Sequence, residues 1–149
     1  MDLIHQLYMT IYIPEAVFRE LTSHGNSIPG AKEVVGCSWI KTHKVQNKER
    51  VRFLSGFLDP GESEAIALAQ EINADLLIID EKTGRAHAKT LGLNITGMIG
   101  ILLLAKERGL ILQVKPYLDR LIATKFKLSL NLYDQALVLA GEKEVIKKA

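Results

Sequence analysis

Short runs of apolar residues alternate with stretches of helical periodicity along this chain. The clearest run, Leu76–Ile79, is continuous, which is typical of a parallel strand covered on both faces. It follows a stretch that opens Asp59-Pro-Gly-Glu, where Asp59 can cap a helix, Pro60 suits the first turn and Glu62 has the spacing of a capping box. The pattern therefore predicts a helix, a turn and a buried strand that ends on Asp80.

The same criteria predict the other elements. Strands are expected at Thr10–Ile13, Ser38–Val45 and Leu93–Thr96. Helices are expected at residues 1–8 (the back half of a helix), Pro14–His24, Ala31–Val35, Glu81–Leu91, Gly97–Arg108, Val114–Thr124 and Ser129–Ala140, with a basic tail at Lys143–Lys148. This order predicts one α/β domain over residues 1–149 with a mostly parallel sheet.

Composition narrows the class of protein. The 149 residues are 48% hydrophobic and 24% charged with a net charge of +2, as in an ordinary globular domain. The single Cys37 excludes an internal disulfide framework and suits a reducing compartment. The chain shows no signal-peptide pattern, and its apolar runs are too short for a membrane span. We expect a cytoplasmic protein with no membrane partner.

Several carboxylates are placed where they could converge. Asp80 follows a predicted strand, so it should lie at the carboxyl edge of the sheet, where open α/β folds bind ligands. Carboxylates gathered there can hold Mg²⁺ or Mn²⁺, which prefer oxygen ligands. The candidates are Glu20, Glu62, Glu64, Asp80 and Glu81. The alternative is structural: Glu62 and Asp80 would cap helices, and the other three would be solvated charges.

A basic run could bind a phosphate backbone. Between positions 41 and 52 the only acid is Glu49, against five cations: Lys41, Lys44, Lys48, Arg50 and Arg52. A solvated strand and helix face would explain the run equally well. The histidines lack metal-ligand spacing, and there is neither a phosphate-binding loop nor a nucleophile elbow, which argues against a zinc site, an NTPase and a serine hydrolase.

Three segments together resemble a known family. They are Leu58-Asp-Pro-Gly-Glu-Ser-Glu-Ala-Ile-Ala-Leu-Ala, Asp75-Leu-Leu-Ile-Ile-Asp-Glu-Lys-Thr-Gly-Arg and Gly92-Leu-Asn-Ile-Thr-Gly-Met-Ile-Gly-Ile-Leu. The chain resembles, from about Leu3 to Glu142, a prokaryotic branch of PIN-domain-like proteins related to the ribonuclease toxins of toxin–antitoxin pairs. The resemblance implies an α/β/α sandwich and a Mg²⁺- or Mn²⁺-dependent nuclease.

The resemblance also implies roles for individual residues. The family's acids match Glu20, Glu62 and Asp80, with Glu64 as a possible substitute for Glu62. Glu81, Arg85 and Thr96 would surround these metal ligands without binding the metal, and the cations from Lys41 to Arg52 would bind RNA. The implied partners are RNA, an antitoxin protein and a second copy in a homodimer. The alternative is a catalytically inactive PIN-like module that binds nucleic acid or protein.

One departure from the family pattern concerns the start of the chain. The family usually begins with a strand ending in a Ser-Asp-Thr-Ser-Pro-Leu-Ile sequence, followed by a helix, and no such segment precedes Leu3. The resemblance therefore predicts that the first strand, most of the first helix and the first catalytic Asp are missing. Because that strand normally lies centrally in the sheet, its absence should expose strand edges and apolar helix faces.

Overall fold

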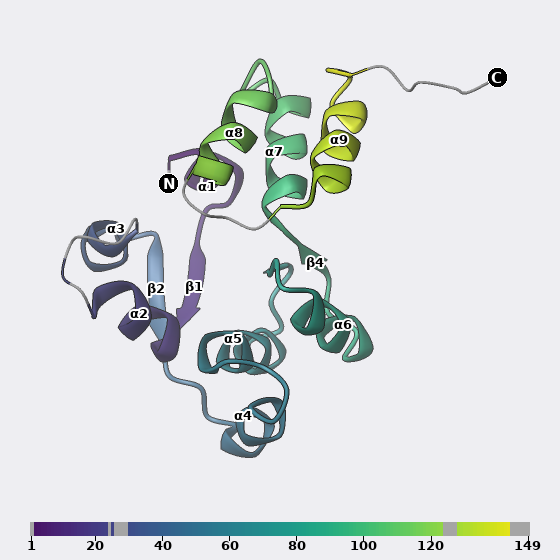
Figure 1. Cartoon of the computed structure of the whole chain (residues 1–149). Coiled ribbons are helices and arrows are strands. Elements are labelled where there is room, and N and C mark those ends of the chain that lie inside the picture. Colours follow the sequence, from purple (N-terminus) through teal and green to yellow (C-terminus); the bar gives the residue numbers. More distant parts are fainter. Residues whose placement is uncertain (1, 24, 26–29, 124–127, 144–149) are drawn as a thin grey trace. The chain divides into compact units, whose positions relative to one another are not determined.

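The protein consists of helices and short parallel strands. Its computed structural model describes residues 2–23, 25, 30–123 and 128–143. Contacts divide the chain into two units, residues 1–96 and 97–149 (Figure 1). The first unit contains, in order, α1 (Asp2–Leu7), β1 (Ile11–Pro14), α2 (Glu15–Thr22), α3 (Ala31–Gly36), β2 (Ile40–His43), α4 (Lys48–Leu54), α5 (Pro60–Glu71), β3 (Leu77–Ile78), α6 (Lys82–Thr90) and β4 (Ile95–Thr96).

The strands of the first unit pair in parallel. β1 pairs with β2 from Ile11↔Ile40 onwards, and β3 pairs with β4 through Leu77↔Ile95. Helices connect the strands of each pair, as parallel pairing requires. The predicted α/β class with parallel strands is confirmed, although among the described residues the pairing is divided between two two-stranded sheets.

Helix α5 organises the first unit. It contacts β1 and β3, one strand from each sheet, and also packs against α2, α4 and α6 (Figure 1). Four consecutive residues, Ile66 to Ala69, are buried, because neighbours cover the helix on several sides. Leu54 of α4 and Ile66 are fully buried in the main apolar cluster, which extends to Leu77 and Ile79 at β3. The helix predicted after Asp59 is therefore the centre of this unit.

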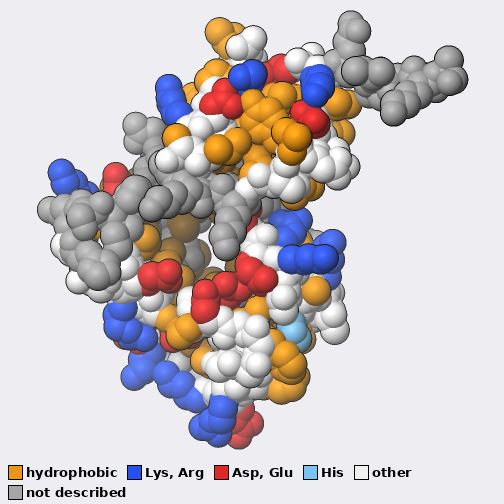
Figure 2. All heavy atoms as spheres, viewed as in Figure 1, with side chains coloured by type: hydrophobic (Ala, Val, Ile, Leu, Met, Phe, Trp, Pro, Cys, Tyr) orange, Lys and Arg blue, Asp and Glu red, His pale blue; other side chains and the backbone are white. Residues whose placement is uncertain are grey.

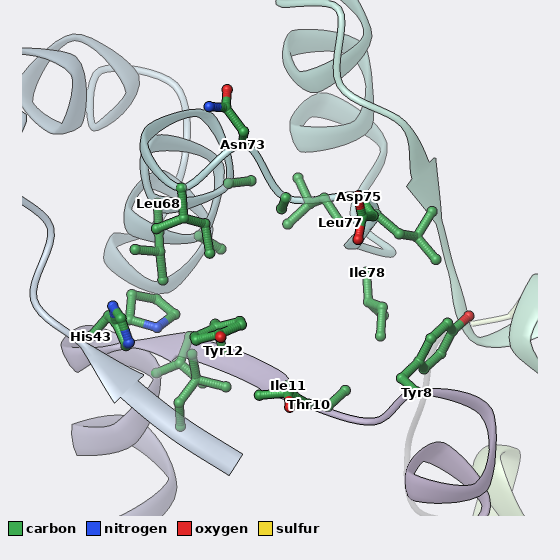
Figure 3. Close-up of a pocket in the computed structure, with 18 of the residues that line it drawn as sticks. Tyr8, Thr10, Ile11, Tyr12, His43, Leu68, Asn73, Asp75, Leu77 and Ile78 are labelled. Carbon is green, nitrogen blue, oxygen red and sulfur yellow. The ribbon is translucent and has the colours of Figure 1, made fainter. Parts of the chain in front are cut away.

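A cleft of about 770 Å³ lies between the two sheets. Residues of β1, including Tyr12, line one wall, and residues of β3, including Ile78, line the other (Figure 3). Leu68 of α5 and His43 of β2 also border it. Apolar side chains dominate this lining, so the cleft exposes surface of the kind that usually contacts another strand or helix.

Some backbone N–H and C=O groups of β1 and β3 point away from their partner strands. Leu77 and Ile79 donate their N–H groups across to β4, at 2.8 Å to the carbonyls of Asn94 and Thr96. Because backbone groups of successive strand residues alternate in direction, Ile78 directs its N–H and C=O away from β4. Ile11 likewise donates to Trp39 beside β2, at 2.9 Å, so Tyr12 directs its groups away from β2. Among the described residues, each sheet therefore has an open edge on a strand that lines the cleft.

The second unit contains α7 (Met98–Glu107), α8 (Lys115–Ala123) and α9 (Leu130–Leu139). Its core includes Ile101, Ala105, Val114, Leu118 and Ala136, all 1% exposed or less. Glu142 joins the helices: it accepts hydrogen bonds from the Val114 N–H at 2.7 Å and from the Lys106 ammonium at 3.0 Å. Burial alone would raise the pKa of Glu142, but these donors outweigh it and lower the pKa.

Local signals in the sequence located most helix ends correctly. Asp59 caps α5 through its carboxylate, which accepts the Glu62 N–H at 2.8 Å, and Ser129 caps α9. The alternative that Asp80 caps α6 is wrong, because Glu81 occupies the cap and accepts the Gly84 N–H at 2.6 Å. β1 has the predicted length but lies one residue further along the chain. The other three strands are shorter than predicted, because among the described residues fewer positions lie opposite a partner strand.

Some predictions fall on parts of the chain that the structure does not describe. The predicted helix ends at His24 and Thr124, and most of the basic tail Lys143–Lys148, lie outside the described residues. Within the described ranges, no helix has the length and apolar character needed to cross a membrane.

Candidate functional site

Acidic side chains meet around the first turn of α5 and the start of α6. Glu62 belongs to the first turn of α5, and Glu81 is the cap of α6. Asp59 and Glu81 both interact with Glu62, through their charges and through side-chain hydrogen bonds. Figure 2 shows acidic side chains gathered on one face of the first unit. Two helix N-termini therefore bring together acids from separate segments of the chain.

Glu62 is the most perturbed acid of this group. Burial, then hydrogen bonding to and repulsion by Asp59, and the charge of Glu81 raise the pKa of Glu62 from its usual 4.5 to about 8. As a carboxylate it has no hydrogen-bond donor for its buried Oε2 atom. As a protonated acid it can donate to Asp59 or Glu81, so the folded protein without metal favours the protonated form.

Glu81 has the opposite environment. Its carboxylate accepts hydrogen bonds from the backbone N–H groups of Gly84 and Thr83, and these lower its pKa. The positive end of the α6 dipole favours a negative charge at the same place. Glu62 and Glu81 are therefore a protonated acid and a carboxylate held side by side.

Two glycines let the acids approach the backbone closely. A Cβ atom on Gly61 would lie 3.0 Å from Oε2 of Glu20 and 3.6 Å from Oδ1 of Asp59. A Cβ atom on Gly84 would lie 3.2 Å from Oε2 of Glu62. Glu20, on α2, is thus brought to the same helix terminus as Glu62, although the two are far apart in sequence.

The remaining predicted acids lie at different places. Asp80 is exposed just past the end of β3, next to Glu81 in sequence. Glu64 points towards α2, where it accepts the Ala16 N–H at 3.2 Å and pairs with Arg19 at 3.7 Å. Its contacts are those of a residue that fixes α2 to α5.

The two other predicted neighbours of the acids support the end of β3. The Arg85 guanidinium donates to the Ile79 carbonyl at 2.9 Å, and the carbonyl of Thr96 accepts the Ile79 N–H at 2.8 Å. Both residues therefore fix the backbone immediately before Asp80. Asp59 is the member of the acid group that sequence reasoning assigned only to a helix cap, and its spacing of three residues from Glu62 was the available signal.

The basic run lies on β2 and α4 and the loop between them. Lys41 is on β2, Lys44 is in the loop, and Lys48, Arg50 and Arg52 are on α4. All five are exposed except the half-buried Arg50, and the ion pairs found within the described residues involve other cations. These five side chains are therefore accessible to an anionic partner.

The donor set suits a divalent cation, because all of its members offer oxygen atoms and one buried oxygen lacks a donor. Within the part of the chain that the structure describes, however, no three His, Cys, Asp or Glu side chains already form a group that could hold a metal ion. Glu62 interacts with Asp59 and with Glu81.

Comparison with known proteins shows the family of this chain. A family profile described as a PIN domain matches residues 1–142, so this chain belongs to the PIN domain family. Neither a curated protein nor a solved structure matches the chain. Membership of the family confirms the resemblance on which the site residues were predicted.

Proposed function

We propose that this protein is a Mg²⁺- or Mn²⁺-dependent ribonuclease of the PIN type, toxin-like in its role, with an antitoxin protein as regulator. The observation that carries the proposal is Glu62, whose buried Oε2 atom has no donor and whose pKa is raised to about 8 beside Asp59 and Glu81. A bound cation would favour the ionised form of this group.

Glu20, Glu62 and Asp80 are the proposed metal ligands, and Glu64 is the substitute. When bound, the metal would activate a water molecule and neutralise charge on the phosphodiester. The chain's own residues would orient these ligands: Gly61 and Gly84 allow their close approach, and Arg85 and Thr96 hold the backbone before Asp80. The exposed cations from Lys41 to Arg52 would bind the RNA backbone.

The first test replaces one proposed ligand and one matched acid. Asp80→Asn is expected to abolish Mn²⁺-dependent cleavage of RNA, because it removes a negative ligand without changing the size of the side chain. Asp75→Asn is the control, since Asp75 is also exposed but lies before β3 instead of after it. Cleavage is measured on a labelled RNA with Mn²⁺ and with EDTA, after thermal unfolding shows that both variants fold.

Equal cleavage by the wild type and Asp80→Asn would rule out this assignment. Equally reduced cleavage by Asp80→Asn and Asp75→Asn would indicate that the loss of a negative charge, and not the loss of a metal ligand, lowers the activity.

The second candidate is a PIN-like module that binds nucleic acid or protein without catalysis. It is favoured by the lack, among the described residues, of three suitably grouped metal ligands. Titration with Mn²⁺ separates the two functions. A saturable site that is lost in Glu62→Gln supports the nuclease, whereas titration without saturation supports the binding module.

A further inference from the structure

Three aromatic rings lie together on the surface of the first unit. Phe53 and Phe57 meet edge to face with ring centroids 5.6 Å apart, and Phe57 lies over His87 with centroids 4.9 Å apart. Phe53 is 58% exposed and Phe57 is 57% exposed. We call these three residues the aromatic patch. Two half-exposed Phe side chains in contact are unusual for a surface without a ligand, because each forgoes burial of a large apolar area.

The aromatic patch adjoins the basic face of α4. Phe53 is on α4 immediately after Arg52, and both side chains are exposed. Lys48 lies one helical turn before Arg52, so the two cations project from the same side of the helix. Phe53 projects from the neighbouring side, which it shares with Glu49 and Arg50, four and three residues before it. His87 belongs to α6, whose N-terminal cap is Glu81. Figure 2 shows basic side chains, an apolar group and a histidine on this part of the first unit.

The aromatic patch also lies near the acid group along the chain. Phe57 is separated from Asp59 by one residue. From Glu81 to His87 the rise along α6 is about 9 Å, which is close to the span of one or two nucleotides. A polynucleotide that places a phosphate at the acids could therefore reach the rings with a neighbouring base.

The charges near the aromatic patch indicate what kind of partner it binds. Exposed aromatic rings can bind either a protein or the faces of unpaired bases. Cations beside the rings favour a polyanion, since lysine and arginine neutralise phosphates while aromatic side chains stack on bases. In a double helix the base faces are covered by their neighbours, so stacking requires a single strand. The combination matches single-stranded RNA better than it matches an apolar protein surface.

We propose that Phe53, Phe57 and His87 form a stacking platform for the bases of single-stranded RNA, with Lys48 and Arg52 binding the adjoining phosphates. This inference rests on the proposed ribonuclease function and deepens it by assigning the binding of unpaired bases to named residues of this chain.

The experiment measures binding without cleavage. Fluorescence anisotropy with a labelled uridine oligonucleotide of about 12 residues is recorded in EDTA, and an abasic oligonucleotide of the same length serves as the second probe. The wild type is expected to bind the uridine oligonucleotide more tightly than the abasic one. Phe53→Ala with Phe57→Ala is expected to weaken uridine binding about tenfold or more and to leave abasic binding unchanged.

Three further variants make the result specific. Phe53→Tyr with Phe57→Tyr keeps the rings and should restore binding. Lys48→Ala with Arg52→Ala should weaken both probes and reduce the dependence of affinity on salt, which the phenylalanine substitutions should not change. Leu112→Ala is the matched control, because Leu112 is an apolar side chain, 91% exposed, in the second unit. It should bind both probes as the wild type does.

Two results would overturn the platform. One is equal affinity of the wild type for uridine and abasic oligonucleotides. The other is unchanged RNA binding in the double alanine variant. If that variant also changed from a dimer to a monomer, the aromatic patch would be a self-association surface instead. Since binding is measured in EDTA, an inactive protein that still stacks bases would contradict the ribonuclease proposal and leave the platform intact.

Discussion

Glu62 shows how a single residue can combine a structural role with a candidate chemical one. Its backbone N–H is held by the Asp59 cap, while its side chain enters a group of acids. The fold disfavours ionisation of this side chain, because burial and the neighbouring carboxylates both oppose a further negative charge. Ionisation of Glu62 therefore lowers the free energy of unfolding as the pH rises towards 8, unless a bound cation compensates for the charge.

The first prediction at this scale concerns the dependence of stability on pH. Glu62 ionises near pH 4.5 when unfolded and at about 8 when folded. Between these values the unfolded state binds fewer protons, so the free energy of unfolding of the wild type should fall as the pH rises. Glu62→Gln removes this contribution and should be more stable than the wild type at pH 8 in EDTA. Urea unfolding at pH 5 and pH 8 measures the effect.

Glu107→Gln is the matched control, because Glu107 is an exposed acid in the second unit. It should keep the pH dependence of the wild type. If Glu62→Gln also kept the pH dependence of the wild type, the pKa of Glu62 would not be raised in the folded protein. Addition of Mn²⁺ should stabilise the wild type more at pH 8 than at pH 5, since metal binding competes with the proton on Glu62.

At the scale of elements, the first turn of α6 is fitted closely against the end of β3. A Cβ atom on Gly84 would lie 2.6 Å from Cδ1 of Ile79 and 3.2 Å from Oε2 of Glu62. Ile79 is buried and belongs to the main apolar cluster of the first unit. The absence of a side chain at position 84 therefore lets α6 approach both the core and the acid group.

Gly84→Ala is expected to lower the free energy of unfolding by about 1–3 kcal/mol, because the added methyl group must displace Ile79 or Glu62. Chemical denaturation measures the change. Gly36→Ala is the control, since a Cβ atom there would meet nothing within 4 Å, and it should be neutral or slightly stabilising.

A second variant identifies the atom responsible. Ile79→Val removes Cδ1, so adding it to Gly84→Ala should cost less than it costs in the wild type. Additive effects of the two substitutions would show that the methyl group does not collide with Ile79.

At the scale of the whole molecule, the division of the pairing into two sheets is the main departure from a continuous α/β sheet. Residues of both β1 and β3 line one cleft, and within the described part of the chain each of these strands has one edge without a partner strand. A sheet edge without a partner leaves backbone groups that a further strand can pair with. The central strand expected from the family pattern would supply backbone N–H and C=O groups that can pair with these edges.

We expect an added strand to join the two sheets. A family-type strand and helix fused before Met1 should raise the unfolding temperature, and the amides of Tyr12 and Ile78 should become protected from hydrogen exchange because they gain acceptors. The control fusion has prolines at alternate positions of the strand, which cannot donate to a ladder. Equal protection in both fusions would show that the cleft does not accept the strand.

Much of the local structure could be predicted from the sequence because it depends on neighbours in the chain. The Asp59 cap, Pro60 in the first turn of α5 and the ends of α6 and α7 near Gly92 and Gly109 follow from local backbone chemistry. Family membership could also be recognised from the sequence, since the acids and their surrounding motifs are contiguous segments.

Tertiary structure decided which acids meet. Glu20 and Asp59 are far apart in sequence, and only the packing of α2 on α5 brings both carboxylates close to Gly61, the residue before Glu62. The choice of Glu81 over Asp80 as the cap of α6, and the direction of Glu64 towards α2, depend on where each backbone turns. The sequence by itself determined most of the elements and the family, because these depend on local and contiguous signals, although it did not predict α4. Packing between distant segments determined the geometry of the candidate site and the cleft.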